Sequence, residues 1–261
     1  MENFKPAYKL LLLFLVIPVI ANCMPPGRQY YEIRIYHLMS VDQEKRIDKY
    51  LAEALLPALH KNNIRNIGVF KPLSNDTAAI RKVYVLIPYR SLDQFGIVNE
   101  KIEKDKDYLS AGADYIDAPF NNAPYLRIER IFAKAFKNMP VMEPVKMGSP
   151  FSERVYEMRS YESATEKLHA RKVKMFNEGD EISIFKRLGF NAVFYSQAIT
   201  GTALPNLIYM ITFDNMAAHD KLWDNFRNDP EWKKISAMKE YENAMYKADS
   251  YLLRPTAYSD Y

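Results

Sequence analysis

The sequence predicts an α+β fold in which two tandem β-α-β-β-α-β repeats form one pseudo-twofold α/β barrel. The main support is an internal repeat. Residues 31–36 read Tyr-Glu-Ile-Arg-Ile-Tyr, and residues 156–161, 125 positions later, read Tyr-Glu-Met-Arg-Ser-Tyr. Two further strand-like segments recur close to the same offset, which aligns Tyr84 on Tyr209. Several matches at one offset rarely arise by chance, so we expect the chain to be a duplication.

Each element of the first repeat has its own sequence signal. A strand of alternating character is followed at once by the capping box Ser40-x-x-Gln43, which begins a helix. Apolar residues at steps of four from Ile47 to Leu59 give that helix one buried face, and Pro57 interrupts it. A second helix and three more strands complete the repeat, with the helix cap at Ser91 and the strands at residues 67–71, 82–89 and 125–131.

The second repeat shows the same order of signals. Its first helix is expected to begin after the capping box Ser163-x-x-Glu166 and to be interrupted at residues 177–179. Its second helix comes after the cap Asn215, and Asp229-Pro230 opens a further helical turn. Its last three strands are expected at residues 191–197, 207–213 and 250–253. This order of elements is the split βαβ pattern of ferredoxin-like units.

The repeated first strand supplies the candidate ligand-binding residues. Two four-stranded sheets, each with helices on one side, cover their bare faces by packing on each other. Ile33 and Ile35 share one face of the first strand, and we expect this apolar face to pack against the helices. The polar face of the strand is then expected to lie between the two sheets and to surround a small organic ligand. The candidates are the two Glu-x-Arg-x-Tyr rows: Glu32, Arg34, Tyr36, Glu157, Arg159 and Tyr161.

Two interpretations of these rows are open. In the first, the charges and hydroxyls satisfy one another for folding, since buried charges are normally paired. In the second, Arg34 or Arg159 binds an anionic group and a buried glutamate acts as general base.

Composition and motifs exclude several functions. The formal net charge is +4 and basic and acidic residues are interspersed, so no nucleic acid is expected as a partner. The four histidines are scattered and there is one cysteine, so we expect no metal site and no cofactor. His169 and His219 fall on predicted helices and are expected to be solvated. The helical spacing of three aromatic residues predicts core or interface anchors rather than a sugar-binding platform: Trp223, Phe226 and Trp232.

The N-terminal residues have the layout of a secretory signal. Lys5 and Lys9 precede an apolar run at residues 10–21, which is too short for a membrane-spanning helix. We therefore expect residues 1–22 to be a signal peptide and the protein to be exported. Cys23 comes next in a lipobox-like setting, although Asn22 departs from that pattern. Two fates are open: a lipoprotein anchored to the membrane through lipid on Cys23, or a soluble periplasmic protein.

The expected domain boundaries come from these signals. The first repeat covers residues 23–136, a linker with three prolines covers residues 137–152, and the second repeat covers residues 153–261. One chain supplies both halves of a barrel, so a homo-oligomer is possible but is not needed for closure.

The repeated strand openings and the segment Trp223-x2-Phe226-x2-Asp229-Pro230-Glu231-Trp232 resemble the NIPSNAP family of dimeric α/β-barrel proteins. Between residues 105 and 122 the first repeat shows no counterpart of Asp-Pro-Glu-Trp. The resemblance implies the barrel fold and no particular reaction. Related barrels include cofactor-free monooxygenases. The leading hypothesis is therefore a protein that binds a small organic molecule, and the alternatives are a cofactor-free oxygenase-like enzyme and a non-catalytic interaction or scaffold protein.

Overall fold

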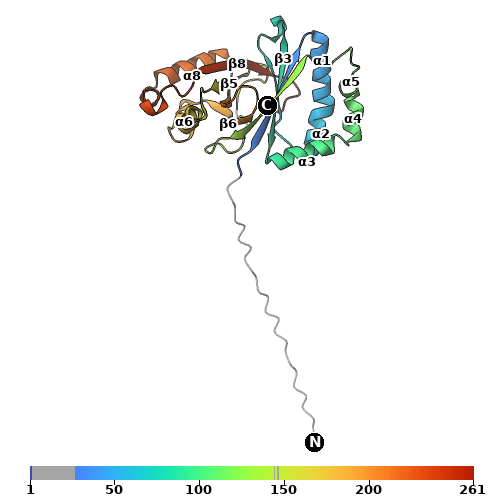
Figure 1. The fold of residues 1–261 in the computed structure, drawn as a ribbon, viewed down its shortest axis with the longest axis horizontal. Helices are drawn as coiled ribbons and strands as arrows, with labels where there is room; N and C mark the ends of the chain where they lie inside the picture. Colours follow the sequence, from blue (N-terminus) through green and yellow to red (C-terminus); the bar gives the residue numbers. More distant parts are fainter. Residues whose placement is uncertain (2–26, 144, 146) are drawn as a thin grey trace.

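Figure 1 shows the computed structural model, which describes residue 1, residues 27–143, residue 145 and residues 147–261. Residues 2–22 of the predicted signal peptide and Cys23 lie outside the described residues. In the part that is described, no helix is both long enough and apolar enough to cross a membrane.

The two repeats contain the same order of elements, with shorter helices added to each. The first contains β1 (Tyr30–Leu38), α1 (Val41–Tyr50), a π-helical turn (Leu51–Leu55), α2 (Leu56–Lys61), β2 (Gly68–Pro72), a 3-10 turn (Asn75–Thr77), β3 (Arg81–Tyr89), α3 (Leu92–Ile102), α4 (Lys106–Ala111), α5 (Ala113–Ile116) and β4 (Arg127–Ala135). The second contains β5 (Val155–Glu162), α6 (Glu166–Asn177), α7 (Glu181–Leu188), β6 (Asn191–Thr200), β7 (Asn206–Phe213), α8 (Met216–Asn228), α9 (Pro230–Ser236), a 3-10 turn (Lys239–Tyr241) and β8 (Lys247–Pro255).

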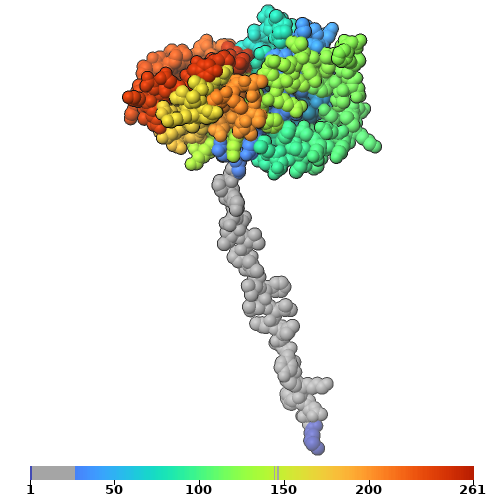
Figure 2. Space-filling view, in the orientation of Figure 1, coloured from blue at the N-terminus to red at the C-terminus, as the bar shows by residue number. Residues whose placement is uncertain are grey.

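The strands form one closed antiparallel barrel in the order β1-β3-β2-β8-β5-β7-β6-β4. Each repeat contributes four strands, and the repeats join where β2 pairs with β8 and β4 pairs with β6. The helices cover the outside of the barrel, those of the first repeat on one side and those of the second on the other (Figure 1). Figure 2 shows the first repeat, blue to green, beside the second, yellow to red. The predicted fold class is confirmed.

The helix caps agree with the sequence signals with one exception. Ser40, Ser91, Asn215 and Asp229 each accept hydrogen bonds from backbone N–H groups in the first turn of their helix. The prediction for Ser163 was wrong, because the Thr165 side chain caps α6. The Ser163 hydroxyl is buried and donates to the carbonyl of Ala244 instead.

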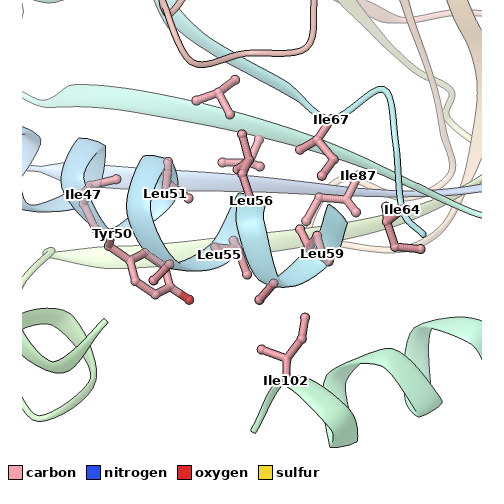
Figure 3. Close-up of a cluster of buried hydrophobic side chains, with 14 of the residues drawn as sticks. Ile47, Tyr50, Leu51, Leu55, Leu56, Leu59, Ile64, Ile67, Ile87 and Ile102 are labelled. Carbon is pink, nitrogen blue, oxygen red and sulfur yellow. The ribbon is translucent and has the colours of Figure 1, made fainter. Parts of the chain in front are cut away.

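The apolar stripe of the first helix is buried as predicted. Ile47, Leu51, Leu55 and Leu59 belong to a core cluster between the helices and the outer face of β1, β2 and β3, part of which Figure 3 shows. The helix runs through a π-helical turn at residues 51–55 before Pro57. Proline has no N–H to continue the α-helical hydrogen bonds, and a wider turn accommodates that loss.

The prediction of which strand face points inward was wrong. The interior of the barrel is filled by apolar and tyrosine side chains that include Tyr31, Ile33 and Ile35. Glu32, Arg34 and Tyr36 lie on the outer face, beneath the helices, as does the corresponding row of β5. Both faces of a strand in such a barrel are buried, so an apolar row fits the interior as well as it fits the helix layer. The rows therefore do not lie between the two sheets.

The repeat offset also changes along the chain. Arg34 pairs with Val85 across the sheet, whereas Arg159 pairs with Tyr209. The structural counterpart of Tyr209 is thus Val85, and the alignment of Tyr84 on Tyr209 was wrong by one residue. A shift of one residue moves a side chain to the other face of a strand, so Tyr84 points into the barrel and Tyr209 toward the helices.

A buried ionic group ties α1 to the neighbouring strands and predicts a pH dependence of stability. Glu44 accepts hydrogen bonds from Lys71 at 2.7 Å and from Arg81 at 2.8 Å. Burial raises the pKa of Glu44, but these hydrogen bonds lower it more, so its pKa lies below the usual value. A depressed carboxyl pKa contributes stability above the unfolded-state pKa of about 4.3, and that contribution disappears as the pH falls through the folded-state pKa.

We therefore expect Glu44→Gln to lower the free energy of unfolding at pH 7 and to lose this difference from the wild type below pH ~4. Urea denaturation between pH 3 and 7 measures it. A difference that stays constant over this range would show that Glu44 acts only through packing.

Candidate functional site

A cavity of about 500 Å³ lies between the outer face of β5 and the helices of the second repeat. We call it the Arg159 cavity. Its lining combines charged and polar groups with large aromatic rings and one methionine: Glu157, Arg159, Tyr161, Lys172, Glu181, Phe185, His219, Asp220, Trp223, Phe226, Arg227, Trp232 and Met245. Its volume is in the range of sites that take small molecules.

Glu157 is the central hydrogen-bond acceptor of the cavity floor. Its carboxylate accepts from Arg159 Nη1 at 2.7 Å, from Ser250 Oγ at 2.5 Å and from Trp223 Nε1 at 2.6 Å. His219 Nε2 lies 3.3 Å from the same carboxylate. These donors come from β5, β8 and α8, so one buried carboxylate links three elements.

Arg159 presents a charged edge to the cavity. Its Nε donates to the Tyr161 hydroxyl at 2.8 Å, and its guanidinium carbon lies 4.5 Å from the centre of the Trp223 ring. Burial lowers the pKa of Arg159, but Tyr209, Tyr161 and Glu157 raise it more, so the group stays charged. The side chain is 22% exposed and lines the cavity, so a ligand can reach it.

A second ion pair lies across the cavity. Lys172 Nζ is 3.0 Å from Glu181 Oε2 and lies against the rings of Phe176 and Trp232, at 4.9 and 5.6 Å from their centres. Burial raises the pKa of Glu181, and Lys172 opposes this without cancelling it. Glu181 therefore accepts a proton more readily than an ordinary glutamate.

Aromatic rings form the cavity wall. The Phe185 and Phe226 rings are stacked with centres 4.7 Å apart, and Trp232 lies 4.4 Å from Phe226. Trp223 is 8% exposed and Phe226 is 4% exposed, so these two are core anchors, as predicted, and line the cavity as well. The chain has two tryptophans, and both are in this wall.

His219 was expected to be solvated, and this prediction was wrong. Its side chain is 15% exposed, and its Nδ1 lies 2.8 Å from Asp220. Its ring lies edge-on to Phe213, with centres 4.8 Å apart. The sequence carried a signal for this position, because His219 precedes Trp223 by four residues and Phe226 by seven, which places all three on one helix face.

In the first repeat the Glu-x-Arg-x-Tyr row, which is Glu32, Arg34 and Tyr36, is buried. Arg34 donates to both carboxylate oxygens of Glu32, at 2.6 and 3.1 Å. The Tyr89 hydroxyl donates to the same carboxylate at 3.3 Å. Glu32 is fully buried and Arg34 is 4% exposed. Burial lowers the pKa of Arg34, but Glu32 and the neighbouring tyrosines raise it more. Of the six predicted residues, Glu157, Arg159 and Tyr161 line a cavity, and Glu32, Arg34 and Tyr36 are sealed under helices.

The first repeat does contain a counterpart of the Asp-Pro-Glu-Trp segment, which the sequence comparison missed. Asp105 caps α4 through Asp107 and Tyr108, just as Asp229 caps α9 through Glu231 and Trp232. Each cap is held by a cation from an earlier helix, Lys61 in the first repeat and Arg187 in the second. The sequence comparison missed this motif because only the aspartate is identical in the two segments. The cap geometry and the ion pair are nevertheless the same.

Within residues 27–143, 145 and 147–261 no cluster of three or more histidine, cysteine, aspartate or glutamate side chains has the arrangement of a metal site. His37 lies 2.9 Å from Glu129 at the edge of the barrel.

Comparison with known proteins agrees with the fold. Residues 156–260, which form the second repeat, match the model of the NIPSNAP family. No curated protein matches the chain. A NIPSNAP family protein from Agrobacterium tumefaciens is 19% identical, with a TM-score of 0.37, over 45% of this chain and 98% of that one.

Some solved structures resemble most of the chain, and two examples show this. A protein from Fusobacterium nucleatum described as a "putative monooxygenase" has a TM-score of 0.57 at 8% identity, over 88% of this chain and 93% of that one. A protein from Lactobacillus acidophilus with the same description has a TM-score of 0.55 at 9% identity, over 88% and 94% of the two chains. At these identities the likeness shows a shared fold.

Proposed function

From a second repeat that matches the NIPSNAP family and a barrel shared with proteins described as monooxygenases, we propose that this protein binds a small organic molecule in the Arg159 cavity. The bound molecule has an apolar body that packs against Trp223 and Phe226. It also has a polar group that accepts a hydrogen bond from Arg159.

The observation that carries this proposal is the contrast between the repeats. Each repeat places a Glu-Arg pair on the outer face of its first strand, and both pairs are hydrogen-bonded. An ion pair that only supports folding does not need a cavity beside its arginine. Only Arg34 is sealed, at 4% exposure, whereas Arg159 is 22% exposed in a cavity.

The charges of the cavity limit the ligand. Arg159 is paired with Glu157, and Lys172 is paired with Glu181. The opposite charges in each pair offset each other, so the two pairs add little net charge to the cavity wall. A neutral or singly anionic molecule fits such a site better than a polyanion, which would have to displace the paired carboxylates.

Arg159→Gln is expected to lower the affinity for the ligand by about 10-fold or more, because a charge-assisted hydrogen bond is worth about 1.5–3 kcal/mol. Native mass spectrometry of the mature protein from its expression host identifies a co-purified ligand, and tryptophan fluorescence then gives the affinity. The matched control is Arg254→Gln, which removes a surface arginine paired with Asp76 and is expected to bind normally. Equal affinities for both variants would contradict the proposal.

A second candidate is an oxygenase-like enzyme that acts on the bound molecule. The observation that favours it is His219, whose ring nitrogens lie 2.8 Å from Asp220 and 3.3 Å from Glu157 inside the cavity. The contact to Glu157 is the longer one, so Nε2 can exchange it for a bound substrate and move a proton there while Asp220 holds Nδ1. Oxygen uptake with the identified ligand tests it, with His219→Gln as the inactive comparison, and the absence of uptake by the wild type rules it out.

We also propose that the protein is exported and that residues 1–22 are removed. The support is the charged and apolar pattern before Cys23. Mass spectrometry of the protein from membrane and periplasmic fractions distinguishes lipid on Cys23 from soluble release.

A further inference from the structure

The two repeats differ in the segments that come directly after the capped helices α4 and α9. In the first repeat, Gly112 leads directly into α5 (Ala113–Ile116), which carries Tyr115. A side chain at Gly112 would meet the backbone of Tyr108 and the side chain of Ile116 within 3 Å, so glycine permits this tight junction. The second repeat has no α-helix between Ser236 and β8 among its described residues.

Tyr115 packs over the polar row of the first repeat. Its ring is stacked on Tyr50, with centres 3.7 Å apart and planes 10° apart, and it lies 6.4 Å from Tyr36. Burial and the neighbouring Tyr36 raise the pKa of Tyr115. The ring therefore lies beside Tyr36, which belongs to the same row as Arg34.

The second repeat has a cavity beside the equivalent residues. Tyr161 and Arg159 occupy the positions of Tyr36 and Arg34 in the pairing of the first strands, and both line the Arg159 cavity. Trp232, at the position of Tyr108 after the helix cap, lines it too. Thus one repeat packs an aromatic ring of its own beside this row, and the other has a cavity beside the equivalent residues.

We infer that Tyr115 occupies in the first repeat the place that a ligand takes in the second, so that the ligand is a planar aromatic ring bearing a hydroxyl group. This inference rests on the proposed function, since it names the chemical class bound by the same cavity. A phenol ring matches the wall because its faces stack on tryptophan and phenylalanine, and its hydroxyl can accept from Arg159 or donate to a carboxylate.

The first experiment compares three molecules with one skeleton. p-Cresol is the side chain of tyrosine, 4-methylcyclohexanol is its saturated form, and toluene lacks the hydroxyl. Because both tryptophans line the cavity, their fluorescence reports binding there directly. We expect p-cresol to bind at least 10-fold more tightly than either analogue. Similar affinities for all three would overturn the inference while leaving the proposed function intact. Failure of every small molecule to bind would overturn both.

The second experiment removes the Tyr115 ring from the first repeat, so that a ligand can take its place. Tyr115→Ala is expected to lower the Tm, and p-cresol is expected to raise the Tm of this variant by several degrees more than that of the wild type, because a second site becomes available. Tyr246→Ala, which removes an exposed tyrosine, is the control and should respond like the wild type. If Tyr115→Ala does not fold, Tyr115→Leu, a smaller loss of volume, replaces it. A Tm response no larger than that of the control would overturn the inference.

Discussion

Replacing Glu32 with alanine is expected to lower the free energy of unfolding by about 3–5 kcal/mol. Glu32 is fully buried and accepts two hydrogen bonds from Arg34, which is itself 4% exposed. The variant would therefore hold a buried guanidinium without its carboxylate, in a place where water has little access to replace the lost partner. Chemical denaturation followed by circular dichroism measures the loss.

Glu157→Ala is the matched change in the second repeat, but it also leaves Trp223 Nε1 and Ser250 Oγ without their acceptor. The two Glu–Arg pairs are therefore compared by their coupling energies from double-mutant cycles, and we expect the energy for Glu157 and Arg159 to be clearly smaller. Arg159 loses the same partner but is 22% exposed in a cavity, where water can solvate its charge. Glu240→Ala, which removes a partner of Lys174 on the exposed surface, is the control and should change stability by less than about 1 kcal/mol. Equal coupling energies for the Glu32–Arg34 and Glu157–Arg159 pairs would contradict an open Arg159 cavity.

Trp223→Ala is expected to lower the free energy of unfolding by about 3–5 kcal/mol and to abolish ligand binding. The Trp223 ring packs edge-on against Phe185, Phe190 and Phe226, with centres 5.2–5.8 Å apart. Its removal takes away both part of the core and one wall of the cavity. Thermal and chemical denaturation measure the first effect, and fluorescence from the remaining Trp232 measures the second.

Trp223→Phe separates the packing of this ring from its hydrogen bond. Phenylalanine keeps much of the apolar volume but cannot donate to Glu157, to which Trp223 Nε1 donates at 2.6 Å. We expect a loss of about 1–3 kcal/mol, the cost of leaving one partner of a buried hydrogen bond unpaired. A loss as large as that of the alanine variant would show that the hydrogen bond, and not the packing, accounts for the effect.

The internal repeat made most of the architecture predictable. Strands, caps and interrupted helices each left a local signal, and the same signals in the same order twice over required two similar units. The Glu-x-Arg-x-Tyr row was also found from the sequence, because two identical polar patterns inside buried strands need a physical explanation. The motif around Asp105 was missed because a cap and a cation can recur in geometry with little sequence identity.

The sequence by itself determined which residues share a strand face, since side chains alternate along a strand whatever surrounds it. Only the tertiary structure decided which face lies inside the barrel, because both faces are buried, one by the opposite sheet and one by helices. Tertiary packing also decided that Tyr115 lies against Tyr50 and Tyr36 in the first repeat, while a cavity lies beside Arg159 in the second. That difference depends on where α5 packs after Gly112, and packing of distant segments leaves no periodic pattern in a sequence.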